Sequence, residues 1–504
     1  MVETVVIISI PLISVIEVAI LFFIKRRMSF FFLIFLSFLA IISFAILSNS
    51  ILLFLLFLFF SIYRIFNLLR GIKKYSQSLL STILNSSIRL NILLLVLVLL
   101  QYNNVSSYLF ITKSLIVYLS IIIVCLILIN IFSRLNISAA KHTHKPIHYY
   151  DKDLPTISVL IPARNETDDL ESCLASLVRS DYPKLEIIVL DDCSLSKKTS
   201  QIIKNFAHNG VRFLQGETPD NDWLPKNYAY EQLAGQANGE IILFCGVDVR
   251  FESHTIRSLV DIFKTENYSM ISVIPKNSYN KADSGSLFYQ PLRYAFEVSL
   301  PRYRLNRPPV LSTCWMIDKK NFIKLGSFKS IRHKVSPESY FSRQILLSKQ
   351  KYKLLKSDRS IGLESYKSSY EQSQTAIRTY YPKLHRRLDL VSILTLFEFF
   401  LFVLPTFSFI LAIVLIDTPM LILASVAIIL QVYYYNQLIN LTFDHKIIRY
   451  RFLVLFAFML DIYLYNKSMF LYEFRQVYWK ERNICLPVLN YRLNQPSIDS
   501  EQKY

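Results

Sequence analysis

Two stretches of the chain decide its fold, Thr156-Ile-Ser-Val-Leu-Ile-Pro162 and Leu185-Glu-Ile-Ile-Val-Leu190. Both are short apolar runs rich in β-branched residues, the pattern of buried strands. The first leads through Ala163-Arg-Asn-Glu166 into residues 168–178, where apolar residues recur at helical spacing. The second ends in Asp191-Asp192-Cys-Ser194 and is followed by another helical stretch. Strands that alternate with helices at this spacing predict a parallel, doubly wound sheet.

Acidic residues follow the predicted strands. In doubly wound sheets ligands bind beyond the carboxyl ends of the strands, which is where Glu166, Asp191 and Asp192 fall. A later strand, within Gly239-Glu-Ile-Ile-Leu-Phe-Cys-Gly-Val-Asp248, ends in an acid at the same edge. A ligand that carries a diphosphate needs a carboxylate-bound divalent cation and nearby positive charge. Asp248 offers the carboxylate, and Lys226 or Arg164 offers the charge.

The two ends of the chain are strongly apolar, whereas the middle has the composition of a globular domain. Hydrophobic residues make up 53% of the 504 residues, which favours a membrane protein. About 20 apolar residues are needed to cross a bilayer. Spans are therefore predicted before the middle domain at 5–24, 28–47, 51–69, 86–102 and 114–132, and after it at 390–416 and 419–441. The run 452–470 carries Asp461 and has basic flanks, so we expect it to be interfacial or re-entrant.

The distribution of positive charge predicts the orientation. Lys and Arg exceed Asp and Glu by 56 − 37 = 19. Basic clusters follow the first, third and fifth spans, a pattern that places the N-terminus outside and the middle domain in the cytosol of a cell-membrane protein. No zinc-finger, helix-turn-helix or RNA-binding signature accompanies the charge, so no nucleic-acid partner is expected. The six cysteines include no C-x-x-C pair, which argues against a disulfide or zinc framework.

These observations divide the chain into six regions. They are an N-terminal transmembrane region (1–135), a linker (136–152), a catalytic domain (153–365), an amphipathic or interfacial segment (366–389), a C-terminal transmembrane region (390–472) and a cytosolic tail (473–504).

The ordered motifs of the middle domain resemble those of family 2 glycosyltransferases. They are Ile-Pro162-Ala-Arg-Asn-Glu166, Leu-Asp191-Asp-x-Ser194 and Asn238-Gly-Glu-Ile-Ile-Leu-Phe-x-x-x-Asp248. Trp223-Leu-Pro-Lys226-Asn-Tyr-Ala229 and Trp479-Lys-Glu-Arg482 are similar to stretches of the membrane-bound, hopene-associated and carotenoid-type members. The resemblance implies an α/β GT-A domain, which is Rossmann-like, between α-helical transmembrane segments.

The resemblance also implies roles for individual residues. Asp191 and Asp192 belong to the nucleoside pocket, and Asp248 holds Mg²⁺ or Mn²⁺. Glu338, in Val335-Ser-Pro-Glu338, stands where the family has the aspartate that acts as general base. The other donor-binding candidates are Pro162, Arg164, Asn165, Glu166 and Lys226, and the acceptor-side candidates are Trp315, Trp479, Lys480 and Arg482. Packing beneath the sheet is the favoured alternative for Trp315, and anchoring at the membrane interface is an alternative for the other three. The sequence departs from the family at Glu338 and at Gly246, where the family has the first aspartate of Asp-x-Asp.

The predicted function is single, inverting transfer of a sugar from a UDP- or GDP-sugar to a lipid or lipid-linked acceptor. Residues 286–300, rich in apolar and aromatic side chains, are expected to lie in the headgroup region beside the acceptor, or alternatively to pack on the domain itself. One alternative function is a processive polysaccharide synthase, although its Gln-x-x-Arg-Trp string is absent. Another is a non-catalytic membrane scaffold, which Gly246 and Glu338 keep open.

Overall fold

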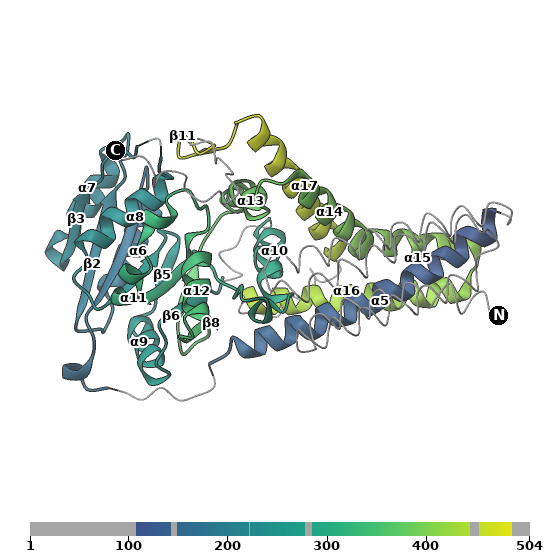
Figure 1. The fold of residues 1–504 in the computed structure, drawn as a ribbon, viewed down its shortest axis with the longest axis horizontal. Coiled ribbons are helices and arrows are strands. Elements are labelled where there is room, and N and C mark those ends of the chain that lie inside the picture. Colours follow the sequence, from purple (N-terminus) through teal and green to yellow (C-terminus); the bar gives the residue numbers. More distant parts are fainter. Residues whose placement is uncertain (1–106, 143–148, 221, 278–284, 444–452, 486–504) are drawn as a thin grey trace, which may run out of the picture. The chain divides into compact units, whose positions relative to one another are not determined.

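The computed structural model describes residues 107–142, 149–220, 222–277, 285–443 and 453–485 (Figure 1). The chain divides into two compact units. The described part of the first is 107–131 and 399–434, and the second comprises 132–398 and the described residues from 435 onward. The predicted spans 5–24, 28–47, 51–69 and 86–102 lie outside the described residues.

A seven-stranded sheet forms the centre of the second unit, with the strand order β3-β2-β1-β4-β7-β6-β8. All neighbouring strands are parallel except β7, which runs antiparallel to both β4 and β6. The predicted doubly wound sheet is therefore confirmed, with one reversed strand added. The strands are β1 (Ile157–Ala163), β2 (Leu185–Asp191), β3 (Val211–Gln215), β4 (Ile241–Cys245), β6 (Met270–Ile274), β7 (Cys314–Asp318) and β8 (Tyr352–Lys356).

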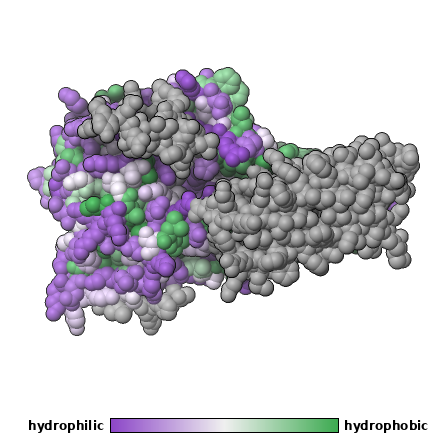
Figure 2. Space-filling model, in the orientation of Figure 1, coloured by the Kyte–Doolittle hydropathy of each residue, from purple (hydrophilic) through white to green (hydrophobic). Residues whose placement is uncertain are grey.

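Helices cover both faces of this sheet, because the side chains of a strand alternate between its faces. In β1, Val159 and Ile161 enter one core and Leu160 enters the other. The first core is closed by α6 (Asp168–Val178), α7 (Lys198–Asn205) and α9 (Thr255–Thr265), and the second by α8 (Pro225–Gln236), α11 (Lys319–Lys324) and α12 (Pro337–Leu347). On the face shown in Figure 2, the described surface over this sheet domain is largely hydrophilic.

Trp315 belongs to the second core. Its side chain is 2% exposed and stacks on Phe244 and Phe341, with ring centroids 4.3 and 5.7 Å apart. Of the two interpretations of Trp315, an acceptor-side residue or packing beneath the sheet, the structure supports the second, because the side chain is buried in an aromatic cluster between β7 and α12. Aromatic side chains of this size dominate the packing energy of a core.

A small second sheet joins two distant segments beside the carboxyl end of β4. Strand β5 (Val249–Phe251) pairs antiparallel with β9 (Leu363–Ser365), which aligns Val249 with Ser365. The backbone N–H of Tyr366 donates to the carbonyl oxygen of Asp248 at 2.9 Å. The residues that follow β9 are thereby fixed next to Asp248.

The second unit continues with helices that pack away from the sheet. Helix α13 (Ser369–Lys383) packs on α17 (Val454–Glu473), and the cluster between them includes Ile377, Tyr381 and Leu464. The Ser468 hydroxyl accepts from the Tyr381 N–H at 3.1 Å, and the Tyr472 hydroxyl donates to the Arg378 carbonyl at 2.7 Å. Helix α14 (Leu388–Glu398) also contacts α17, and the two-stranded hairpin of β10 (Tyr478–Trp479) and β11 (Arg482–Asn483) follows α17.

Helix α10 (Ser286–Val298) corrects the expectation that residues 286–300 lie in the headgroup region. Most of its apolar side chains are buried inside the protein, among them Leu292, Tyr294 and Val298 at 3% exposure or less. Phe296 is 40% exposed. The alternative interpretation, packing on the domain's own core, is the one that the structure supports.

Four helices in the described residues are long and apolar enough to cross a membrane: Thr112–Ala139, Leu388–Leu415, Thr418–Thr442 and Val454–Glu473. The first lies within α5 (Ser107–Ala139), at the predicted span 114–132, and the second runs through α14, a π-helical turn (Phe399–Val403) and α15 (Leu404–Leu415). The third is α16. The last, α17, is a continuous helix that includes most of the run expected to be interfacial or re-entrant.

The described part of the first unit is held together by apolar packing and by polar contacts between its helices. Leu119 packs with Ala412, Met420 and Ala424, and all four are fully buried. The side-chain amides of Asn130 and Gln431 donate to the backbone carbonyls of Leu430 and Leu401 at 3.1 and 2.8 Å. Buried side-chain amides are stable where they find such partners.

The burial of Trp315 predicts that Trp315→Ala acts on stability. Removing a buried tryptophan costs about 3–5 kcal/mol, because transfer energy is lost and a cavity remains. The apparent midpoint of thermal unfolding of the detergent-purified protein should fall by several degrees. Trp315→Phe should lower the midpoint by only part of this amount. Trp223→Ala, at a partly exposed site, should also lower the midpoint less than Trp315→Ala. An alanine variant that melts like the wild type but no longer uses its acceptor would contradict the structural role.

Candidate functional site

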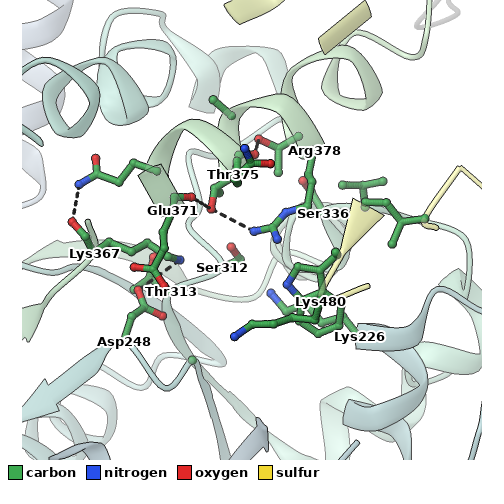
Figure 3. A pocket seen from close by; sticks show the side chains of 18 of the residues that line it. Lys226, Asp248, Ser312, Thr313, Ser336, Lys367, Glu371, Thr375, Arg378 and Lys480 are labelled. Atoms are coloured by element: carbon green, nitrogen blue, oxygen red, sulfur yellow. Dashed lines mark hydrogen bonds and ion pairs between the residues drawn. The ribbon is translucent and has the colours of Figure 1, made fainter. Parts of the chain in front are cut away.

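A cavity of about 600 Å³ lies in the second unit, at the carboxyl ends of the sheet strands (Figure 3). Residues from the loops after β1 and β4 line it, together with residues of α13 and of the β10–β11 hairpin. Seven residues predicted for the site reach it: Pro162, Glu166, Lys226, Asp248, Glu338, Trp479 and Lys480. The other predicted residues, which are Arg164, Asn165, Asp191, Asp192, Arg482 and Trp315, are not among its lining residues.

Asp248 presents a mostly buried carboxylate to the cavity, with a side chain that is 13% exposed. The Ser365 hydroxyl donates to Oδ2 at 2.9 Å, and the Lys367 ammonium lies 3.4 Å from the same oxygen. Burial alone would raise the pKa of this carboxyl, but Lys367, Arg293 and Ser365 lower it to about 2. Asp248 is therefore ionised at every physiological pH.

Gly246 explains how the Asp248 side chain fits. A Cβ atom at position 246 would lie 2.5 Å from Oδ1 of Asp248, far inside van der Waals contact. The missing side chain thus leaves the space that the Asp248 carboxylate occupies.

The donor set at Asp248 fits a divalent cation that is shared with a substrate. No cluster of three or more His, Cys, Asp or Glu side chains able to hold a metal is found in the part of the chain that the structure describes. Mg²⁺ is commonly held by one or two carboxylates together with substrate phosphates and water. A single ionised carboxylate at the ligand-binding edge meets that requirement only when a phosphate completes the site.

Glu338 is a second buried carboxylate on the cavity wall. It lies in the first turn of α12, after Pro337, and the residue is 4% exposed. Among the described residues no donor reaches its Oε2 atom. Burial raises the pKa of Glu338, and the positive charge of Lys226 opposes this rise. A buried carboxylate with a free oxygen and a raised pKa has the properties of a proton acceptor.

Positive charge surrounds the two carboxylates. Lys226, in the first turn of α8, lies 5.6 Å from the centre of the Tyr230 ring, and burial lowers its pKa. Burial likewise lowers the pKa of Arg378, to about 10, and the guanidinium lies 6.0 Å from the Trp479 ring centre. In Figure 3 the side chains of Lys226, Arg378 and Lys480 all project into the cavity. Such a set of cations suits a ligand that carries phosphate.

Behind the cavity wall, the loops after β1 and β2 are tied to the C-terminal hairpin. One Arg482 nitrogen donates to both carboxylate oxygens of Asp192, at 2.8 and 3.0 Å. Arg164 donates to the backbone carbonyls of Asp192 and Cys193 and, through Nε, to that of Lys480 at 3.1 Å. Burial raises the pKa of Asp192, and Arg482 opposes the rise. The Asp192 carboxylate, expected to hold a nucleoside, is engaged by Arg482 in this structure.

Asp191 and Asn165 shape the same loops. The Asp191 carboxylate accepts the Ser194 N–H at 3.0 Å, and the Asn165 side chain accepts the Leu195 N–H at 2.8 Å. The Asn165 N–H donates to the Ser194 hydroxyl at 2.9 Å. These hydrogen bonds stabilise the loops after β1 and β2. In this structure the side chains of Asp191 and Asn165 therefore shape the loops.

The sequence did not indicate that Lys367 and Arg378 belong to the site, and Arg293 lies within residues 286–300, which were expected in the headgroup region. Lys367 reaches Asp248 because β9 pairs with β5, and these strands are separated by more than 100 residues. No local motif signals such a pairing. Arg378 lies on α13, which the sequence suggested was an interfacial segment.

Comparisons with known proteins agree with this geometry. Residues 158–326 match Glycosyl transferase family 2. The chain is 30% identical over 122 residues to 4,4'-diaponeurosporenoate glycosyltransferase of Staphylococcus haemolyticus, covering 24% of this chain and 32% of the relative. It is 30% identical over 127 residues to the poly(ribitol-phosphate) beta-N-acetylglucosaminyltransferase TarS of Staphylococcus aureus, covering 24% and 21%. The chain thus spans about a third or less of the length of these relatives.

A solved structure, the mannosyltransferase PcManGT from Pyrobaculum calidifontis in complex with GDP-Man and Mn²⁺, is 13% identical with a TM-score of 0.41. The match covers 72% of this chain and all of that one. Residues 158–326, which hold the motifs and most of the sheet, match Glycosyl transferase family 2, and a mixed, mostly parallel sheet with helices on both faces matches the GT-A fold.

Proposed function

We propose that the protein is a membrane glycosyltransferase that transfers a sugar from a UDP- or GDP-sugar to a hydroxyl of a lipid or lipid-linked acceptor, one sugar at a time and with inversion. The observation that carries the proposal is the pair of buried carboxylates in one cavity. Asp248 is held ionised by cations, whereas Glu338 has a raised pKa and a free oxygen. Two carboxylates with separated pKa values take separate roles in catalysis.

Asp248 supports the donor. It would hold Mg²⁺ or Mn²⁺ together with the donor diphosphate, and such an ion offsets the negative charge that develops on the leaving nucleoside diphosphate. Lys226 lines the same cavity and supplies further positive charge toward the phosphates. Charges fixed before the reaction stabilise a developing charge without reorganisation.

Glu338 supports the acceptor. Its carboxylate takes the proton of the acceptor hydroxyl as the oxygen attacks the anomeric carbon of the sugar. The attack breaks the bond between that carbon and the diphosphate oxygen. One base suffices for a single displacement, which inverts the anomeric configuration and needs no covalent intermediate.

The path from the cavity to α17 supports a lipid acceptor. Helix α13 lines the cavity with Glu371, Thr375 and Arg378. Its other side packs on α17, which is long and apolar enough to span a membrane. An acceptor held in a bilayer would present its head group at a fixed height, which lowers the entropy lost on meeting the donor. We further propose that the protein lies in the cell membrane with this domain in the cytosol.

A product assay tests the proposed function. Membranes that contain the protein are incubated with a panel of nucleotide-sugars, and the extracted lipids are compared by mass spectrometry with membranes that lack it. A new lipid carrying one added sugar is expected. Long polymers would favour the processive alternative. Transfer of the sugar only to water-soluble sugar or to protein would exclude a lipid acceptor, and the absence of any product would favour the scaffold.

Asp248→Asn should abolish transfer and weaken donor binding in Mg²⁺ or Mn²⁺, because the amide removes the charge that balances the cation and Lys367. Expression should be unchanged. Transfer is followed by nucleotide release and donor binding by calorimetry. Asp151→Asn is the matched control, since that carboxylate is a surface partner of Arg257 with 68% exposure. Full activity of Asp248→Asn, or of the wild type in excess chelator, would remove the metal from the mechanism.

Glu338→Gln should lower turnover by about two orders of magnitude or more, the usual scale for loss of a general base. Donor affinity should stay close to that of the wild type, because Glu338 acts on the acceptor. Glu338→Asp should retain partial activity, since the carboxylate remains but its reach is shorter. Steady-state rates and nucleotide titrations separate the two effects. Normal turnover of the glutamine variant would assign the base to another residue.

A further inference from the structure

The turn of the C-terminal hairpin has an unusual backbone for its residues. Trp479 pairs with Arg482, so the loop consists of Lys480 and Glu481 alone. Both have positive φ values, 47° and 69°. Two-residue hairpin loops of this kind favour glycine, asparagine or aspartate, because other side chains are strained there. Strained positions persist only where the surroundings hold them, and they gather at functional sites.

Contacts on both sides of the turn hold it in place. Arg482 is bound by Asp192, and the Lys480 carbonyl accepts from Arg164 Nε at 3.1 Å. The Ile484 N–H donates to the Val477 carbonyl at 3.0 Å, which closes the hairpin below the turn. The backbone of Lys480 is thus anchored to the loop after β1. The anchored backbone directs the side chain into the cavity (Figure 3).

The Lys480 ammonium lies 3.0 Å from the Glu166 carboxylate, and both residues line the cavity. Its side chain is 29% exposed. Five further basic residues line the same cavity, so positive charge faces a space that a ligand would fill; they are Lys226, Arg293, Lys367, Arg378 and Lys383. A lysine ammonium carries three donors on a flexible stem, and it can keep one contact while it gains another.

We propose that Lys480 binds the diphosphate of the nucleotide-sugar donor and rests on Glu166 when the donor is absent. The proposal rests on the proposed function and moves Lys480 from the acceptor side, where the sequence analysis placed it, to the donor side. The contacts of the hairpin decide this assignment: Lys480 contacts Glu166, which follows β1, and Arg482 contacts Asp192, which follows β2, at the edge where the donor is expected. Arg482 and Arg164 position Lys480 and do not themselves reach the cavity.

Nucleotide binding to the full-length protein in detergent tests this assignment. UDP and GDP, and then UMP and GMP, are titrated calorimetrically with Mg²⁺ present. Lys480→Met should weaken binding of the preferred diphosphate about tenfold or more, the scale of one charge-assisted hydrogen bond, and leave the monophosphate within about twofold. Lys480→Arg should restore most of the affinity. Arg475→Met, which removes an exposed cation from the same segment, should bind like the wild type.

A double variant separates a phosphate ligand from a residue that only neutralises Glu166. If Lys480 merely cancelled that negative charge, Glu166→Gln combined with Lys480→Met would recover wild-type affinity, and the proposal would be wrong. We expect the double variant to stay weak. Melting curves confirm that each variant is folded. Equal binding by Lys480→Met and the wild type overturns the inference alone, whereas a wild type that binds no nucleotide overturns the proposed function as well.

Discussion

The site depends on keeping one charge, that of Asp248, in a mostly buried place. A buried carboxylate is costly unless cations and hydrogen bonds compensate it. Here the compensation comes from Ser365 at the end of β9, Lys367 shortly after it and Arg293 on α10, and Gly246 leaves room for the carboxylate. The β5–β9 pairing places Ser365 and Lys367 beside Asp248. The need to compensate the Asp248 charge therefore determines how the residues around this carboxylate are arranged.

Glu338 shows the opposite solution to the same problem. It has Lys226 as its main counter-charge, its Oε2 atom finds no donor among the described residues, and its pKa rises. One cavity therefore holds a carboxylate fixed as an anion and another able to exchange a proton. That division is the physical basis of the proposed chemistry. The α13–α17 packing then connects it to a helix suited to a membrane.

The sequence predicted the parts of the fold and the site whose pattern lies within one short stretch of the chain. The apolar runs before Glu166 and Asp191 predicted two neighbouring strands, and strand-end acids predicted the ligand edge, because parallel strands end on one side of a sheet. Long-range pairing was out of reach: nothing near Lys367 indicates that β9 meets β5. Composition misled at α10, whose apolar and aromatic residues looked suited to a lipid headgroup region but are mostly buried in the protein. The roles assigned to the individual site residues remain predictions.

The most direct test of the two-carboxylate account is the pH dependence of transfer compared with that of nucleotide binding. Glu338 must be ionised to accept a proton, and its pKa lies above the ordinary 4.5, so kcat/KM should fall as the pH is lowered toward and through that raised pKa. Asp248, with a pKa of about 2, stays ionised over the same range, so nucleoside diphosphate binding should persist to lower pH. Separate acid limbs are the expected result. Transfer and binding that fall together with one midpoint would contradict the account.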